Sequence, residues 1–343
     1  MAPLLCVFFA AVSATSATFA GNHSCILDPT LPENLTLHAD VQPLCAGFID
    51  PTMAPFLAAG DGKTDDTDAI QAALEAGYLA RMAVLLPSSR TYVVSKQLHA
   101  IQRGRPAQMR AFGYQLVGAR GDSPPVLKVM DNTDAANFPS TYSSENPKLN
   151  DPARPVIVYA LNMSGLSNDA ASHYSALLRN IDIDLGHNPA LSGVAMSGAQ
   201  LCSIEDVRVY GSAFVSGFVG IPGSGGFSAN LEVTGGKFAV WQQQFRPNPS
   251  ITGLLARNQT VAGVLLENSR GPLVLSGFSI RSSAAQLRAG IWATAHPGGN
   301  GGLALEVGVG SGNRHSASML ADPLLLPPKS CTPRVMQMYV NLG

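Results

Sequence analysis

The chain of 343 residues carries 22 lysine and arginine residues against 23 aspartate and glutamate residues, a formal net charge of −1. A balance this close to neutrality offers no basic surface to nucleic acid or to an anionic membrane, so neither is expected as a partner. Apolar residues make up 46% of the sequence and charged residues only 13%, which excludes an intrinsically disordered chain.

Residues 1–20 have the composition of a secretory signal peptide. An apolar run from Pro3 to Val12 is followed by small residues, with cleavage expected after Ala17 or Ala20. No lysine or arginine precedes the run, which leaves a membrane anchor as the alternative, although the run is short for a bilayer span. The sequence therefore predicts a secreted protein. N-glycosylation sequons, compatible with that compartment, stand at Asn22, Asn34, Asn162 and Asn258.

Residues 21–55 form a proline-rich arm with little core of its own. Loss of the signal peptide leaves four cysteines, which in a secreted chain favour two disulfides. These cysteines are Cys25, Cys45, Cys202 and Cys331. The pair expected first is Cys25 with Cys45, because both lie in this arm.

No metal or cofactor is expected. The cysteines and histidines lack the CxxC or clustered spacing of a metal site. The sequence GKT at 62–64 resembles the end of a phosphate-binding loop, but position 57 is leucine where that loop requires glycine.

Residues 68–82 have the periodicity of an amphipathic helix. Apolar or small residues recur on one face, and Asp68 with Gln71 resembles a capping box. The residues on that face are Ile70, Ala73, Leu74, Gly77 and Tyr78. We expect this helix to cover the N-terminal opening of the fold, followed by two short strands around a Pro-Ser turn within residues 84–95.

A repeat of about two dozen residues is the most informative feature. Each copy consists of a small or turn-forming residue followed by apolar, variable, apolar and variable positions. The first apolar residues of the copies lie 26, 24, 23 and 24 residues apart, at Ile181, Val207, Leu231, Leu254 and Phe278. Further copies are expected at residues 302–306 and at 156–158.

Alternation with a period of two indicates strands that bury one face. One short strand for each copy of this length is typical of a β-solenoid, in which neighbouring coils bury each other. Leucine-rich repeats need a regular leucine and asparagine frame, and a β-sandwich needs more closely spaced strands. The sequence therefore predicts an all-β, single-stranded right-handed parallel β-helix over residues 56–310, with an N-terminal capping α-helix and a tail at 311–343.

The repeat aligns the outward positions into two columns. The first consists of Asp182, Arg208, Glu232, Leu255 and Ser279, and the second of Asp184, Tyr210, Thr234, Arg257 and Arg281. Paired carboxyl groups are what glycoside hydrolysis requires, so Glu232 and Asp182 are candidate catalytic residues and Arg208, Asp184 and Tyr210 candidate binding residues. The alternative is a solvated ladder that only avoids like-charge contact. Arg208 between the two carboxylates is expected to lower the pKa of both.

Four segments resemble known protein families. GDGKTDDTDAIQAAL at 60–74, followed by LPSSRTYVVS at 86–95, resembles the opening of the pectate-lyase-like superfamily of right-handed β-helices. GAQLCSIEDVRVYG at 198–211 and GSGGFSANLEVTGGKFAVWQQQF at 223–245 are similar to exo-β-1,3-glucanases (laminarinases) built from two tandem β-helices. The resemblance covers about residues 56–291.

The resemblance to the glucanases implies inverting hydrolysis of β-1,3-glucan in a cleft between two β-helices. Gln243 and Gln244 match the glutamines that line this cleft and help to position water. The general-acid glutamate of these enzymes lies in the second β-helix, so the resemblance implies a second β-helix domain or chain as a partner.

Three functions are compatible with these features of the sequence. A secreted glycoside hydrolase acting on β-1,3-glucan or a related polysaccharide is expected first. A polysaccharide lyase would need positive charge to neutralise a uronate and a base to abstract a proton. A non-catalytic glycan-binding or surface-structural solenoid would need only the rigid polar face.

Overall fold

A computed structural model of the chain describes eleven segments. They are residues 48–102, 113–140, 142–143, 152–160, 174–243, 249–267, 273–282, 289–294, 303–308, 319–321 and 338–341. The predicted signal peptide, the Cys25–Cys45 pair and the sequons at Asn22, Asn34 and Asn162 lie outside these residues. Asn258 lies on an exposed turn.

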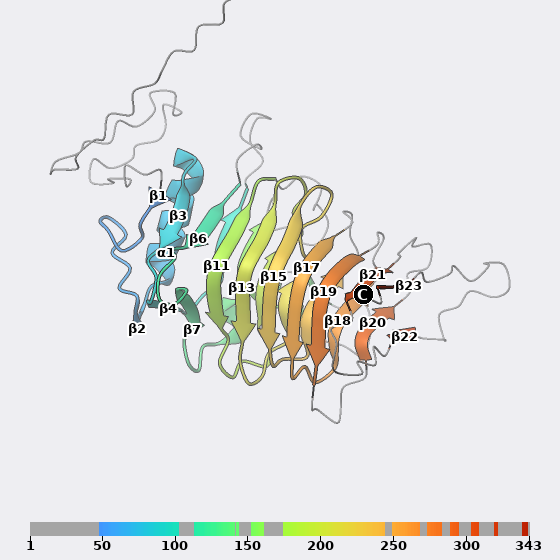
Figure 1. The fold of residues 1–343 in the computed structure, drawn as a ribbon. Coiled ribbons are helices and arrows are strands. Elements are labelled where there is room, and N and C mark those ends of the chain that lie inside the picture. Colours follow the sequence, from blue (N-terminus) through green and yellow to red (C-terminus); the bar gives the residue numbers. More distant parts are fainter. Residues whose placement is uncertain are drawn as a thin grey trace, which may run out of the picture.

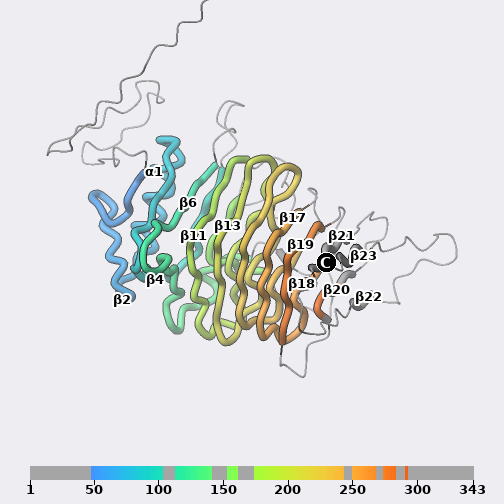
Figure 2. The backbone as a smooth tube through the Cα atoms, viewed as in Figure 1, coloured from blue at the N-terminus to red at the C-terminus, as the bar shows by residue number. Residues whose placement is uncertain are grey.

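Two long parallel sheets form the walls of the molecule, and successive coils stack along one axis (Figures 1 and 2). The larger, 13-stranded sheet runs in the order β1-β3-β6-β11-β13-β15-β17-β19-β21-β23, with β2, β4 and β7 attached off this path. Its strands are β1 (Phe48–Ile49), β2 (Asp61–Asp65), β3 (Ala83–Leu86), β4 (Thr91–Val94), β6 (Gln115–Gly118), β7 (Val126–Val129), β11 (Leu177–Asp184), β13 (Ser203–Tyr210), β15 (Phe227–Thr234), β17 (Ser250–Arg257), β19 (Leu273–Arg281), β21 (Leu303–Gly308) and β23 (Met338–Asn341).

The second sheet has eight strands in the order β22-β20-β18-β16-β14-β12-β10-β5. They are β5 (Leu98–Ile101), β10 (Pro155–Ala160), β12 (Ser192–Met196), β14 (Ser216–Val219), β16 (Phe238–Gln243), β18 (Ala262–Glu267), β20 (Ala289–Thr294) and β22 (Met319–Ala321). A short antiparallel pair, β8 (Tyr142–Ser143) with β9 (Pro152–Ala153), and the 3-10 turn η2 (Ala135–Asn137) complete the described elements. This architecture is the predicted right-handed parallel β-helix.

The helix α1 (Thr67–Ala80) covers the N-terminal end of the solenoid, as predicted (Figure 1). It packs against β1, β3, β5 and β6 with its buried face. The Gln71 side chain donates to the backbone carbonyl of His99 at 2.9 Å and accepts from the His99 amide at 2.8 Å. Since β5 is the edge of its sheet, Gln71 satisfies backbone groups that would otherwise be open to another strand.

The predicted capping box of Asp68 and Gln71 is wrong. The N-cap residue is Asp66, and its side chain makes no capping hydrogen bond to the helix. Its carboxylate instead accepts the amides of Ala59 at 2.6 Å and Gly60 at 3.0 Å, which fixes the loop that leads into the helix. Gln71 is unavailable for a capping box because it is bonded to β5.

The repeat predicts the register of the central strands correctly. Ile181 pairs with Val207, Val207 with Leu231, and Leu231 with Leu254, all within the 13-stranded sheet. None of these four side chains is more than 2% exposed, and all belong to one core filled from both sheets. The inward apolar positions therefore account for the stacking of the coils.

The turn-forming residue at the start of each copy has a conformational role. The backbone φ is positive at all five positions: Asn180 (54°), Asp206 (54°), Asn230 (53°), Gly253 (79°) and Gly277 (59°). Asparagine, aspartate and glycine are the residues that tolerate this left-handed region. Each long strand is thus bent at the same point, and the bends align along the solenoid.

Two expected copies of the repeat are placed differently. Residues 156–158 belong to β10 in the second sheet, where Ile157 pairs with Val194. In β21, Leu303 pairs with Leu273 and not with Phe278, a difference of five positions from the expected register. Paired strands also lie beyond the predicted limits 56–310, because β1 pairs with β3, β22 with β20, and β23 with β21.

Candidate outer-face site

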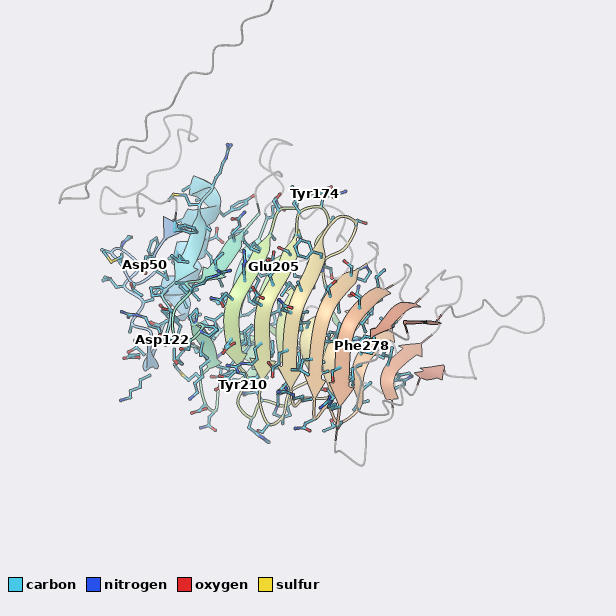
Figure 3. The ribbon with its side chains drawn as sticks, viewed as in Figure 1. Asp50, Asp122, Tyr174, Glu205, Tyr210 and Phe278 are labelled. Carbon is cyan, nitrogen blue, oxygen red and sulfur yellow. The ribbon has the colours of Figure 1, made fainter. Side chains whose placement is uncertain are left out.

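The two outward columns predicted from the repeat exist in the 13-stranded sheet. Asp182, Arg208, Glu232, Leu255 and Ser279 occupy successive paired positions, as do Asp184, Tyr210, Thr234, Arg257 and Arg281. Figure 3 labels Tyr210 near the lower ends of these strands and Glu205 higher on the same sheet. We refer to the two columns together as the outer-face ladder.

Asp182 and Arg208 form an ion pair within the ladder. Arg208 donates a hydrogen bond from Nη2 to Oδ2 of Asp182. The side chain of Asp182 is only 6% exposed, whereas that of Arg208 is 47% exposed. Asp182 is therefore nearly buried beneath its partner, in contrast to the outward, solvated carboxylate that the sequence predicts.

The expectation that Arg208 lowers the pKa of Asp182 is wrong in its net direction. Burial raises the pKa of Asp182, and this contribution exceeds the lowering by the hydrogen bond and charge of Arg208. The hydrogen bond to Asp182 raises the pKa of Arg208, which stays cationic. Asp182 consequently holds a proton more readily than an ordinary aspartate.

Glu232 has a different partner, which the sequence analysis did not assign to it. Arg257 donates a hydrogen bond from Nη1 to Oε1 of Glu232 at 3.0 Å. Their side chains are 50% and 31% exposed, so the pair faces solvent. The signal that could have revealed it is the position of Arg257 one coil away in the neighbouring column, within diagonal reach of a long side chain.

Asp184 and Tyr210 make different kinds of contact: Asp184 bonds to the backbone, and Tyr210 contacts Arg208. Asp184 accepts the backbone amide of Gly186 at 2.9 Å and so stabilises the turn after β11. Arg208 lies over the ring of Tyr210, with 5.3 Å between its guanidinium carbon and the ring centroid. Tyr210 thus supports the arginine from below through a cation–π contact.

A trough of about 420 Å³ lies beside Glu232 on the same face. It follows the bend positions of β15, β17 and β19, where Gly253 and Gly277 contribute no side chains. Its lining consists of Asn230, Leu231, Glu232, Gly253, Leu254, Leu255, Gly277, Phe278 and Ser279. The trough combines one carboxylate with apolar side chains, an amide and a hydroxyl group, a mixture typical of small-molecule sites.

The glutamines inferred from the resemblance do not join this face. Gln243 ends β16 in the second sheet, where its backbone position pairs with Glu267. Gln244 lies outside the described residues. The structure therefore does not bring Gln243 onto the sheet that carries Asp182, Arg208 and Glu232.

Glu267 is a buried carboxylate that the sequence analysis missed. It is 1% exposed and accepts a hydrogen bond from Nε1 of Trp241 at 2.9 Å. It lies in β18, whose residues are buried on both faces, so no alternating pattern marks it. In the described residues, no three His, Cys, Asp or Glu side chains are grouped closely enough to hold a metal ion.

Residues 55–287 match the protein family described as "Rhamnogalacturonase A/epimerase, pectate lyase-like". The chain belongs to this family. The match confirms the pectate-lyase-like superfamily inferred from residues 60–95 and identifies a polysaccharide-acting, β-helical family. It does not test the narrower resemblance of residues 198–245 to the exo-β-1,3-glucanases.

Solved structures of β-helical proteins are similar at low identity. The A-module of Azotobacter vinelandii mannuronan C-5 epimerase AlgE6 is 18% identical with a TM-score of 0.35, over 79% of this chain and 62% of that one. The Streptococcus pneumoniae surface adhesin PfbA is 12% identical with a TM-score of 0.37, over 80% and 78%. An Acinetobacter phage tailspike is 10% identical with a TM-score of 0.39, over 77% and 50%. The comparison with curated protein sequences gave no match.

In the described residues of this pectate-lyase-like protein, no helix is both long and apolar enough to cross a bilayer.

Proposed function

We propose that the protein is a secreted, polysaccharide-binding β-helix that holds its glycan along the outer-face ladder and hydrolyses it there. The observation that carries this proposal is the placement of Asp182, Arg208, Glu232 and Arg257 beside a trough on one rigid face. Family membership supports a polysaccharide as the ligand. The resemblance of residues 198–245 favours β-1,3-glucan or a related glucan.

Two carboxyl groups with different environments support an inverting hydrolysis. Burial raises the pKa of Asp182, which suits a proton donor, while Glu232 accepts a hydrogen bond from Arg257 and is 31% exposed, so that it can contact water as a base must. Two coils separate them, a backbone distance of about 9–10 Å. Carboxyl groups of inverting enzymes lie about 6.5–9.5 Å apart, so the side chains would have to lean toward each other.

A second candidate is glycan binding without cleavage. Asp182 is 5% exposed, and each of the two carboxylates forms an ion pair with an arginine. Such a ladder still binds hydroxyl groups through its arginines and through the floor of the trough. This arrangement favours recognition if the ion pairs persist when a glycan is bound.

The experiment compares the parent protein with Glu232→Gln and Asp182→Asn on laminarin and on polygalacturonate, with binding measured separately from turnover. Loss of turnover with retained binding in both variants supports hydrolysis. Binding without turnover in the parent supports the second candidate. An unsaturated, ultraviolet-absorbing product from polygalacturonate identifies a lyase.

Asp68→Asn provides the matched control, because its side chain is 88% exposed on the capping helix. It should leave both binding and turnover unchanged. A parent protein that binds neither polysaccharide contradicts the proposal as a whole.

A further inference from the structure

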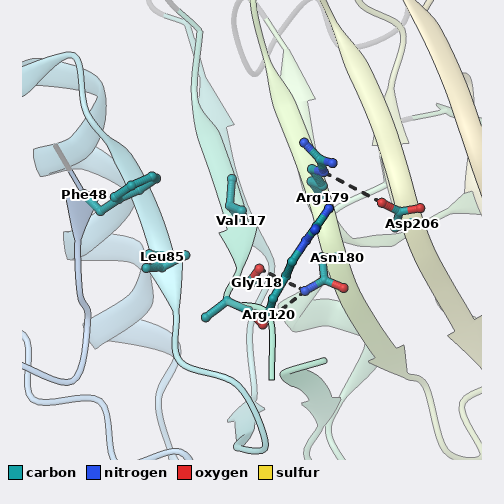
Figure 4. Close-up of a pocket in the computed structure, with 9 residues that line it drawn as sticks. Phe48, Leu85, Val117, Gly118, Arg120, Arg179, Asn180 and Asp206 are labelled. Atoms are coloured by element: carbon teal, nitrogen blue, oxygen red, sulfur yellow. Dashed lines mark hydrogen bonds and ion pairs between the residues drawn. The ribbon is translucent and has the colours of Figure 1, made fainter. Parts of the chain in front are cut away.

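Arg179, Asn180 and Asp206 line a second groove on the larger sheet, and each already has a partner (Figure 4). Arg179 forms an ion pair with Asp206, and the Asn180 amide donates to the carbonyls of Gly118 and Ala119. The turn after β17, at the lower edge of the same sheet in Figure 1, is different. It presents a polar side chain that has no partner among the described residues.

This side chain belongs to Asn258, the first residue of the sequon Asn-Gln-Thr at 258–260. Asn258 is exposed, and its side chain forms no hydrogen bond within the part of the chain that the structure describes. Its backbone φ of 60° lies in the left-handed region that asparagine tolerates. The amide nitrogen, to which an N-linked sugar is attached, is therefore accessible in the folded protein.

The middle residue of the sequon holds the turn in place. Gln259 is fully buried, and its side-chain amide donates to three backbone carbonyl groups. They belong to Val233 at 3.2 Å, Gly235 at 3.1 Å and Arg257 at 2.9 Å. Because Gln259 points into the molecule, the residues on either side of it, Asn258 and Thr260, are both exposed.

The hydroxyl group of Thr260 is only loosely held. It donates to the carbonyl of Gly236 at 3.4 Å, which is long for a hydrogen bond between two oxygen atoms. The backbone amide of Thr260 bonds to the same carbonyl at 2.9 Å. The backbone therefore fixes this position, and the hydroxyl that defines the sequon has no structural role of its own.

Small residues flank Asn258 in the neighbouring coils. Thr234 pairs with Arg257, so Gly235 and Asn258 follow at equivalent positions. Arg257 pairs with Arg281, so Ser282 is the equivalent residue in the next coil. Gly235 has no side chain, and the Ser282 hydroxyl turns to the carbonyl of Gln259 at 2.8 Å. Neither neighbour shields Asn258, which leaves room for a bulky group.

We propose that Asn258 carries an N-linked glycan in the secreted protein, at the edge of the larger sheet directly beyond Arg257 of the outer-face ladder. N-linked glycans are bulky, solubilising groups found on surface loops of secreted proteins. The inference rests on the secretion that the proposed function includes, and not on the polysaccharide that the ladder binds.

The reaction transfers an oligosaccharide from a lipid-linked diphosphate donor. The side-chain nitrogen of Asn258 forms a bond to the anomeric carbon of the first sugar and gives up one proton. The bond between that carbon and the phosphate oxygen breaks, and the lipid diphosphate leaves. No oxidant or reductant is involved.

The test expresses the full chain in a eukaryotic secretory cell line and maps peptides of the protein recovered from the medium. Peptide-N-glycosidase converts a glycosylated asparagine to aspartate, so mass spectrometry should find this conversion at position 258. Thr260→Ala should abolish the modification of Asn258, whereas Thr260→Ser should retain it. Neither variant should unfold the protein, because the Thr260 hydroxyl makes only the long contact to Gly236.

Asn132 is the matched control within the same protein. It is exposed with a φ of 60°, but Asp134 stands where a sequon requires serine or threonine. It should stay unmodified. Secreted protein with an unmodified Asn258 overturns the inference and leaves the proposed polysaccharide binding intact. Modification that persists in Thr260→Ala overturns the assignment to the sequon. A chain that stays in the cells with its leader uncleaved contradicts the secretion on which both proposals rest.

Discussion

Arg257 donates its hydrogen bond to Glu232 across 25 residues of sequence, from one column of the outer-face ladder to the other. Directly paired positions place Arg257 beside Thr234 and Glu232 beside Leu255, so the contact is diagonal. Arg208, in contrast, contacts Asp182 directly opposite it. The Arg257–Glu232 pair thus links the two columns, whereas the Arg208–Asp182 pair lies within one column. Of the two candidate catalytic carboxylates, Asp182 is nearly buried and Glu232 faces solvent.

Leu231→Asp should destabilise the solenoid by about 3–5 kcal/mol, the cost of an uncompensated buried charge. Leu231 is 1% exposed and packs in the common core between the two sheets. Thermal or urea unfolding measures the effect. Phe227→Asp in the same strand is the control, because Phe227 is 47% exposed and should tolerate the charge. Equal losses in the two variants would contradict the assigned strand register.

The carboxyl group of Asp182 should titrate above 3.8, its ordinary pKa, because it is buried. The folded state then binds more protons than the unfolded state at pH values between 3.8 and the raised pKa of Asp182. Through this window the contribution of Asp182 to the unfolding free energy decreases as the pH rises. Carbon NMR of the carboxyl groups measures the titration directly.

Asp61 provides an internal comparison in the same titration. Backbone amides of Thr64 and Lys63 donate to it and lower its pKa, so it should titrate on the acidic side of 3.8. Arg208→Gln should raise the pKa of Asp182 further, since it removes the opposing charge and hydrogen bond. A midpoint for Asp182 below that of Asp61 would show that the ion pair dominates over burial.

The central strands of the larger sheet, β11, β13, β15, β17 and β19, could be predicted from the sequence because their apolar positions alternate and each contains a residue suited to positive φ. The second sheet could not, since strands such as β12 and β18 are buried on both faces and show no alternation. Residues 156–158 are apolar at the expected spacing, but no residue suited to positive φ precedes them. This explains why the repeat assigned them to the larger sheet, although they lie in β10 of the second sheet. Glu267 could not be predicted because it lies in β18, which shows no alternation. The position of Arg257 in its column was predicted correctly, but its hydrogen bond to Glu232 in the other column was not.

Gly277→Ala should cost about 1–2 kcal/mol of unfolding free energy from backbone conformation alone. A Cβ at Gly277 would meet no atom closer than 3.6 Å, so space is available and only the φ of 59° is unfavourable. Gly277→Asn should cost less, because asparagine tolerates this region, as Asn230 does in the same column of bends. Urea unfolding of both variants compares the costs, and an alanine variant as stable as the parent would refute the conformational role.

Gly277→Asn should also weaken polysaccharide binding at the trough while the fold is retained. The added side chain would occupy the hollow beside Glu232 without changing the charge of the ladder. Gly186→Asn is the control, because Gly186 has a similar φ of 57° and open surroundings but lies outside the trough. Calorimetric titration with a laminarin oligosaccharide should therefore show weaker binding for the first variant and unchanged binding for the second. Equal affinity of Gly277→Asn and the parent would place the glycan elsewhere on the molecule.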